Sequence, residues 1–134
     1  MTEILFGIFI VLHGLVHLWY VTLSQGLVEF QAEMGWTGES WLFSPLFGGA
    51  ATRLLATVLY SLAAFSFVAG GVGFFAQWAW WRPVIIGSAA FSAVIILLFW
   101  DGGLQMIVEK GLIGFLINAA LLVALLVFDW PSLQ

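Results

Sequence analysis

The stretch that decides the fold is ILFGIFIVLHGLVHLWYVTL, residues 4–23, which contains no Asp, Glu, Lys or Arg. About 20 apolar residues in an α-helix cross the roughly 30 Å hydrocarbon core of a bilayer. Three further apolar runs follow, at residues 52–76, 83–100 and 111–128. Because backbone polar groups in hydrocarbon must be satisfied within their own segment, each run is predicted to be a helix. The sequence therefore predicts an all-α polytopic membrane protein with four transmembrane helices.

The composition of the whole chain indicates the same class. Of its 134 residues, 63% are hydrophobic and 7% are charged, and the mean hydropathy is +1.14. Soluble domains are typically about 25% charged, so a soluble globule is excluded. Four spans leave no room for a separate soluble domain, and we expect one transmembrane domain over residues 1–134. Short links between the later spans favour an up-down bundle, with a long interfacial loop at residues 24–51.

The charge balance and the missing cysteines exclude several classes of protein. The net charge is −4, and Arg53, Arg82 and Lys110 are the strong cations. Nucleic-acid binding needs a basic patch, so we expect no nucleic-acid partner. The absence of cysteine excludes disulfides and thiolate metal sites.

An even number of spans places both termini on one side of the membrane, together with the turn at residues 77–82. Arg82 and the α-amino group on that side nearly balance Arg53 and Lys110 on the other side. From the positive-inside rule we expect cytoplasmic termini, and dual topology stays open.

The first span divides into two faces when each residue advances by about 100°. His13, His17 and Tyr20 share one stripe with small residues, whereas the opposite face is apolar and should meet lipid. Gly7 and Gly14 lie on the same stripe as the histidines. Small residues let membrane helices approach closely, so this face is predicted to pack on a neighbouring helix.

The polar residues of the spans gather near one membrane boundary. A rise of about 1.5 Å per residue places His17 roughly 9 Å and His13 roughly 15 Å below the boundary on the side of the 24–51 loop. Tyr60 and Asn118 lie about 12 Å below the same boundary. The opposite half of the bundle is apolar. This asymmetry predicts a polar pocket that opens toward the long loop.

The 24–51 loop is longer than most structureless connections, and connections of this length are often functional. Trp36 and Trp41 lie in it among glycines and glutamates, and they suggest either a lid over the pocket or an interfacial segment that covers the bundle end. Arg53 and Asp101 at the boundary either anchor helix ends or orient a ligand headgroup. The candidate ligand-binding residues are His13, His17, Tyr20, Trp36, Trp41, Arg53, Tyr60, Asp101 and Asn118.

The i, i+4 spacing of His13 and His17 permits two nitrogen ligands on one metal ion, which normally needs a third ligand. Asp101 and Glu109 are the candidates for that ligand. Two histidines on one helix cannot ligate a single haem from opposite faces, so haem is not expected. Structural hydrogen bonds to a neighbouring carbonyl, serine or asparagine, and proton transfer, are the alternatives for these rings.

The chain resembles a group of uncharacterised bacterial four-span membrane proteins, some of which are labelled loosely as permeases. The matching segments are HGLVHL (residues 13–18), GWTG (35–38), SWL (40–42), WWRP (80–83), FWDG (99–102) and GLIG (111–114) with Asn118. The layout also distantly resembles the DoxX-like four-helix proteins, some of which are associated with quinone or redox partners. The resemblance implies a location in the bacterial inner membrane.

Three function classes follow from these observations. The first is a binding module that holds a lipid-like or quinone-like molecule in the loop-side pocket. The second is an accessory subunit of a membrane complex or a homo-oligomer that packs through its glycine faces. The third is a small proton-coupled transporter. The sequence does not favour an enzyme, because it contains no recognisable nucleophile–base pair.

Overall fold

The computed structural model describes residues 1–29 and 31–132, and within these ranges the chain forms helices and no strand. The α-helices that make up the spans are α1 (Thr2–Val16), α2 (Leu18–Ser24), α4 (Gly49–Phe75), α5 (Trp81–Leu98) and α6 (Ile113–Leu126). The short elements are the 3-10 turn η1 (Ala32–Met34), α3 (Phe43–Phe47) and the π-helical turn η2 (Val108–Leu112).

Four helical segments are long and apolar enough to cross a membrane. They are Thr2–Ser24, Gly49–Phe75, Trp81–Leu98 and Val108–Leu126. The first combines α1 with α2, and the last combines η2 with α6. The prediction of an all-α protein with four spans is therefore confirmed, with helix ends within a few residues of the predicted ones.

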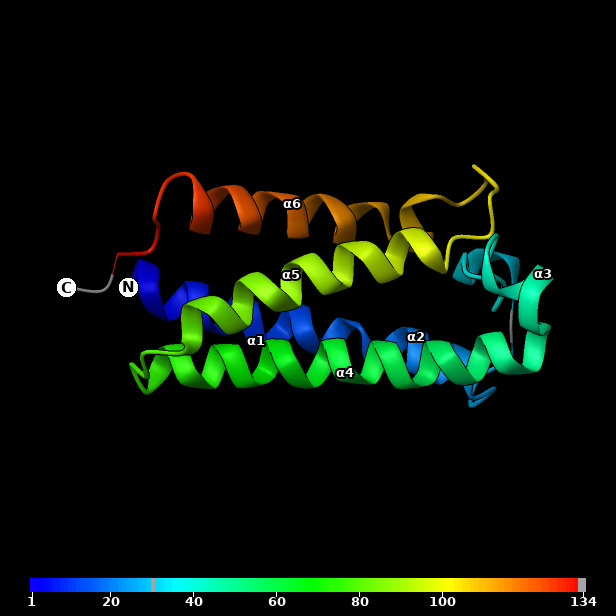
Figure 1. The fold of residues 1–134 in the computed structure, drawn as a ribbon, viewed down its shortest axis with the longest axis horizontal. Helices are drawn as coiled ribbons and strands as arrows, with labels where there is room; N and C mark the ends of the chain where they lie inside the picture. Colours follow the sequence, from blue (N-terminus) through cyan, green and yellow to red (C-terminus); the bar gives the residue numbers. More distant parts are fainter. Residues whose placement is uncertain (30, 133–134) are drawn as a thin grey trace.

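The four spans lie side by side as an up-down bundle (Figure 1). The start of α1, the end of α6 and the turn between α4 and α5 lie at one end, and α3 and the other described residues of the long loop lie at the other. Helix α1 packs on α4, α4 packs on α5, and α5 packs on α6. In contrast, α1 and α6 make few or no close backbone contacts, so the seam between them is the loosest in the bundle.

Glycines bring α1 and α4 together, as the small-residue stripe predicted. A Cβ atom added to Gly14 would lie 2.6 Å from the Cβ of Phe67 and 3.1 Å from the backbone oxygen of Ala64. On the facing helix, a Cβ at Gly71 would lie 2.6 Å from Val11. These distances are shorter than van der Waals contact, so only glycine permits this approach of the two backbones.

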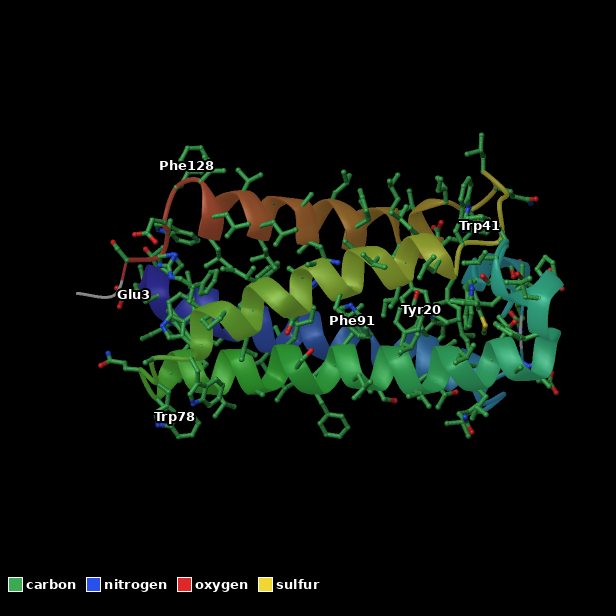
Figure 2. All side chains as sticks on the ribbon, in the orientation of Figure 1. Glu3, Tyr20, Trp41, Trp78, Phe91 and Phe128 are labelled. Carbon is green, nitrogen blue, oxygen red and sulfur yellow. The ribbon has the colours of Figure 1, made fainter. Side chains whose placement is uncertain are left out.

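Large apolar side chains cover the outer surface of the bundle, where the bilayer contacts them (Figure 2). Exposed examples include Leu12 on α1, Phe65 on α4, Val94 on α5 and Leu116 on α6. In water such a surface would be strongly unfavourable, whereas in lipid it costs nothing. The surface fits an integral multi-pass membrane protein in contact with the bilayer.

The long loop forms the C-terminal cap of α5. The last carbonyls of a helix lack partners within the helix, and in a membrane protein they need donors from elsewhere. Trp41 donates from its ring to the Leu97 oxygen and from its backbone to the Trp100 oxygen, both at 2.8 Å. Ser40 donates to the oxygen of Leu98, and Trp36 donates to that of Phe99 at 2.8 Å. Four successive carbonyls are thus satisfied by one loop segment.

Candidate functional site

The first span is interrupted at His17, between α1 and α2. The backbone N–H of His17 donates to the oxygen of Gly14, three residues back. The ring Nδ1–H of His17 donates instead to the oxygen of His13, four residues back, at 2.9 Å. A side-chain donor has thus entered the backbone ladder of the helix, which is a recognised cause of a local break. The break fixes the orientation of the His17 ring.

Four side chains from three spans form a closed polar network. His13 Nε2 lies 2.9 Å from Asn118 Oδ1, and Asn118 Nδ2 donates to the hydroxyl of Ser92 at 2.8 Å. Ser92 Oγ lies 2.6 Å from Nε2 of His17. All four side chains are buried, and those of Ser92 and Asn118 are inaccessible. The network holds the first, third and fourth spans together.

The partners determine where the protons lie in the neutral network. Because an amide oxygen only accepts, His13 carries its proton on Nε2. Because His17 donates from Nδ1 to a carbonyl, its Nε2 accepts the proton of Ser92. The hydroxyl of Ser92 can then accept from Asn118. The remaining lone-pair nitrogen is Nδ1 of His13, which has no partner among the residues that the structure describes.

A cavity of about 680 Å³ lies beside this network, at the loop-side end of the seam between α1 and α6. Its volume is within the range of ligand sites in proteins, roughly 300–1,000 Å³. Its lining residues are His13, Val16, His17, Trp19, Tyr20, Gln31, Glu33, Met34, Ile96, Val108, Glu109, Gly111, Ile113, Gly114 and Ile117. Both histidines and residues of the long loop therefore border the same space.

Tyr20 forms one wall of the cavity, and aromatic rings support it from behind. Its hydroxyl donates to the backbone oxygen of Glu109 at 3.3 Å. The ring stacks on Tyr60 with 4.6 Å between centroids, and the ring of Trp36 meets both at an angle. Tyr60 and Trp36 are buried to 1% exposure and do not line the cavity. They hold Tyr20 in place instead.

Gly111 lets the fourth span begin close to Tyr20. Its φ of 114° is one that residues with a Cβ rarely adopt. A Cβ at this position would also lie 3.0 Å from the hydroxyl of Tyr20 and 3.0 Å from Ile96. Both features require glycine, and they set the start of α6 against the cavity.

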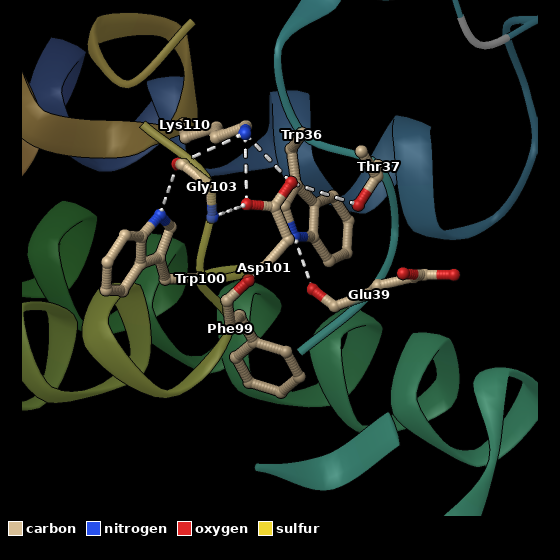
Figure 3. Close-up of polar contacts among 8 residues, drawn as sticks. All are labelled: Trp36, Thr37, Glu39, Phe99, Trp100, Asp101, Gly103 and Lys110. Carbon is tan, nitrogen blue, oxygen red and sulfur yellow. Dashed lines mark hydrogen bonds and ion pairs between the residues drawn. The ribbon is translucent and has the colours of Figure 1, made fainter. Parts of the chain in front are cut away.

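The remaining predicted site residues lie away from the cavity. Asp101 pairs with Lys110 at 2.9 Å, and both side chains are largely buried (Figure 3). Arg53 is exposed and borders a separate hollow of about 320 Å³ beneath the loop. Trp41 is 53% exposed and caps α5. The structure thus brings His13, His17 and Tyr20 to the cavity, with Asn118 directly behind them.

Two residues of the network and the loop were missed as site candidates from the sequence. Ser92 joins His17 to Asn118, and its signal was the pair of serines four residues apart in the third span at the depth of the histidines. Lys110 neutralises Asp101, and its signal was an opposite charge at the other end of the same short link.

The described residues provide no third ligand for a metal ion beside His13 and His17. They contain no group of three or more His, Cys, Asp or Glu side chains that could hold an ion. Both ring nitrogens of His17 and one of His13 already make hydrogen bonds. Ligation of one ion by both rings would therefore have to break a hydrogen bond of His17.

Comparisons with models of known protein families, with curated proteins and with solved structures found no match for the chain. Its function must therefore be argued from the site itself.

Proposed function

We propose that the protein binds an uncharged quinone-like or lipid-like molecule in the loop-side cavity. The carrying observation is a single space of about 680 Å³ that combines two histidines and a tyrosine with apolar walls. Ligand sites are mostly apolar with a few placed polar groups, which is the composition of this lining. Ionisable residues within a membrane usually serve a function, and here they border a space instead of being packed on all sides.

The polar groups favour a ligand that donates a hydrogen bond. Nδ1 of His13 carries a lone pair, and the Tyr20 oxygen can accept a further bond while it donates to Glu109. Glu33 and Glu109 are the charged residues among the described lining, which contains no Lys or Arg. Two carboxylates disfavour a phosphate group. A quinol or alcohol hydroxyl therefore suits the cavity better than an anionic headgroup.

The direct test is to purify the protein in mild detergent and to identify co-purified molecules by mass spectrometry. Val16→Trp fills the mouth of the cavity from a lipid-facing position. Leu15→Trp is its matched control, because Leu15 is also exposed but does not line the cavity. We expect a quinone-like or hydroxylated lipid in the wild type and in Leu15→Trp, and its loss from Val16→Trp. Equal amounts in both variants, or bulk phospholipid alone in the wild type, would contradict the proposal.

We further propose that the protein lies in a bacterial inner membrane with both termini in the cytoplasm. Arg82 lies in the first turn of α5, at the end of the bundle that holds the turn between α4 and α5, whereas Arg53 and Lys110 lie at the other end. Ion pairs do not separate the two ends, because Arg82 pairs with Asp129 as Lys110 pairs with Asp101. The proposal rests on the weight that the positive-inside rule gives to a cation in a short connection next to a span. A C-terminal green fluorescent protein fusion should fluoresce, and a C-terminal alkaline phosphatase fusion should be inactive. The reverse pattern would overturn the orientation.

A further inference from the structure

A second cavity extends the seam between α1 and α6 toward the opposite side of the membrane. Its volume is about 350 Å³. Its lining is apolar apart from Thr2 and includes Leu5, Phe9 and Ala120. Ile117 lines both this cavity and the loop-side cavity. One residue thus lines both spaces, along the seam between α1 and α6, where the described parts of adjacent spans pack least closely.

We propose that this second cavity holds the apolar tail of the ligand, and that the ligand is a single long-chain amphiphile that enters sideways from the bilayer. The inference rests on the proposed function, because the head of the same molecule occupies the loop-side cavity. The hydroxyl-bearing head lies against His13 and Tyr20, and the tail passes Ile117 between α1 and α6.

The length of the combined groove selects the tail. Along the first span, the lining runs from Thr2 to Tyr20, which corresponds to about 27 Å at 1.5 Å per residue. The acyl chain of a phospholipid covers one leaflet, about half of the roughly 30 Å hydrocarbon core. With its head beside Tyr20, such a chain would end before it filled the second cavity. A tail that runs from the loop-side cavity to Thr2 must continue past the middle of the membrane.

The residues at the edges of the groove support entry from the bilayer. Val16 and Ile113 flank the loop-side cavity and are 61% and 51% exposed, and Leu5 flanks the second cavity at 60%. In a membrane these exposed apolar side chains face lipid. The opposite route, through the loop, crosses the hydrogen bonds that tie Trp36 and Ser40 to α5. The lipid-facing seam has no described hydrogen bond between α1 and α6 beyond that of His13 with Asn118.

The test uses two photoreactive benzoquinols in phosphatidylcholine nanodiscs with the full-length protein. One carries the diazirine on its head, and the other carries it at the end of a long isoprenoid tail. We expect the head probe to label residues of the loop-side cavity and the tail probe to label Thr2–Phe9 and residues 117–124. An excess of a short-tailed quinol should displace both probes, because it occupies the head site.

Ala120→Phe provides a variant that fills only the second cavity, and Ala119→Phe is its control. Both alanines are exposed on α6, but only Ala120 lines the cavity. Tail labelling should fall several-fold in Ala120→Phe and stay at the wild-type value in Ala119→Phe, while head labelling persists in both. Head labelling with tail labels spread over all lipid-facing helices would overturn the tail assignment alone. Absence of displaceable labelling by either probe would overturn the proposed function as well.

Discussion

Nε2 of His17 and the hydroxyl of Ser92 lie 2.6 Å apart, although 75 residues separate them in the chain. The contact joins the first span to the third, and Asn118 joins the third to the fourth through the same hydroxyl. In the neutral network the donors follow one order: His13 to Asn118, Asn118 to Ser92, Ser92 to His17, and His17 back to the oxygen of His13. The position of the proton in each hydrogen bond therefore determines which atom must donate in the next one.

This order predicts different tautomers for two rings that lie four residues apart. His13 should carry its proton on Nε2, and His17 on Nδ1, because their partners are an amide oxygen and a carbonyl. Nitrogen-15 chemical shifts of selectively labelled histidine in nanodiscs distinguish the two forms. The same tautomer on both rings, or a charged ring at neutral pH, would contradict the network.

Replacing Ser92 by alanine should destabilise the bundle more than the same change at Ser88. Ser92→Ala leaves Nε2 of His17 and Nδ2 of Asn118 without their hydrogen-bond partner, which costs about 1–3 kcal/mol. Ser88 is also buried, but its hydroxyl donates only to the Val84 oxygen of its own helix. Thermal unfolding in detergent, followed by tryptophan fluorescence, measures both variants. Equal losses would show that the network adds little to stability.

The loop should loosen when Trp36 becomes phenylalanine. The variant keeps an aromatic ring but loses the N–H that donates to the Phe99 oxygen at 2.8 Å and to the Glu39 oxygen at 3.2 Å. Hydrogen exchange of residues 31–41 should speed up. Trp41→Phe is the control at an exposed position, where water or lipid headgroups can replace the lost donor, and it should change exchange less. Faster exchange in Trp41→Phe than in Trp36→Phe would contradict the prediction that Trp36 holds the loop on α5.

The pair of Lys110 and Asp101 should behave as a unit. Their side chains are 7% and 11% exposed, so removing one partner leaves a largely buried charge. Lys110→Met alone should cost about 3 kcal/mol or more, as is typical of a broken buried pair. The double variant with Asp101→Asn should recover part of that loss, because neither charge is then unpaired. Additive losses in a double-mutant cycle would show that the two residues act independently.

Alanine should be tolerated at Gly87 but not at Gly111. A Cβ at Gly87 meets nothing within 4 Å, and within a helix alanine is favoured over glycine by roughly 0.5–1 kcal/mol. Gly111 has a φ of 114° and lies against Tyr20, so Gly111→Ala should destabilise the protein and displace Tyr20 from its bond with Glu109. Thermal unfolding measures the difference, and a stable Gly111→Ala variant would disprove the requirement.

Hydropathy was enough to predict the four spans, because the bilayer fixes both the length and the backbone structure of each one. The rise per residue also placed His13 and Asn118 at similar depths, and they are in contact. The depth of a residue does not, however, determine how its helix is rotated about its own axis, and therefore which neighbour its side chain contacts. Tyr60 and Asn118 lie at matching depths, yet Tyr60 stacks behind Tyr20 while Asn118 bonds to His13.

Side chains in the loops could not be placed from the sequence in the same way. The sequence places Asp101 together with Arg53 at the membrane boundary, whereas the fold pairs Asp101 with Lys110, nine residues further along the chain. The path of the long loop depends on glycines with positive φ at Gly35 and Gly38, and on carbonyls of α5 that become acceptors only when that helix ends. Neither the positive φ angles nor the end of α5 produces a periodic pattern in the sequence.

The cap on α5 also implies an order of assembly. Its side-chain donors precede their acceptors by 56 to 63 residues in the chain. During synthesis the 36–41 segment is therefore complete before the end of the third span leaves the ribosome. The final carbonyls of the third span therefore need no partner that is synthesised later, and the loop and the end of α5 can reach their final arrangement together.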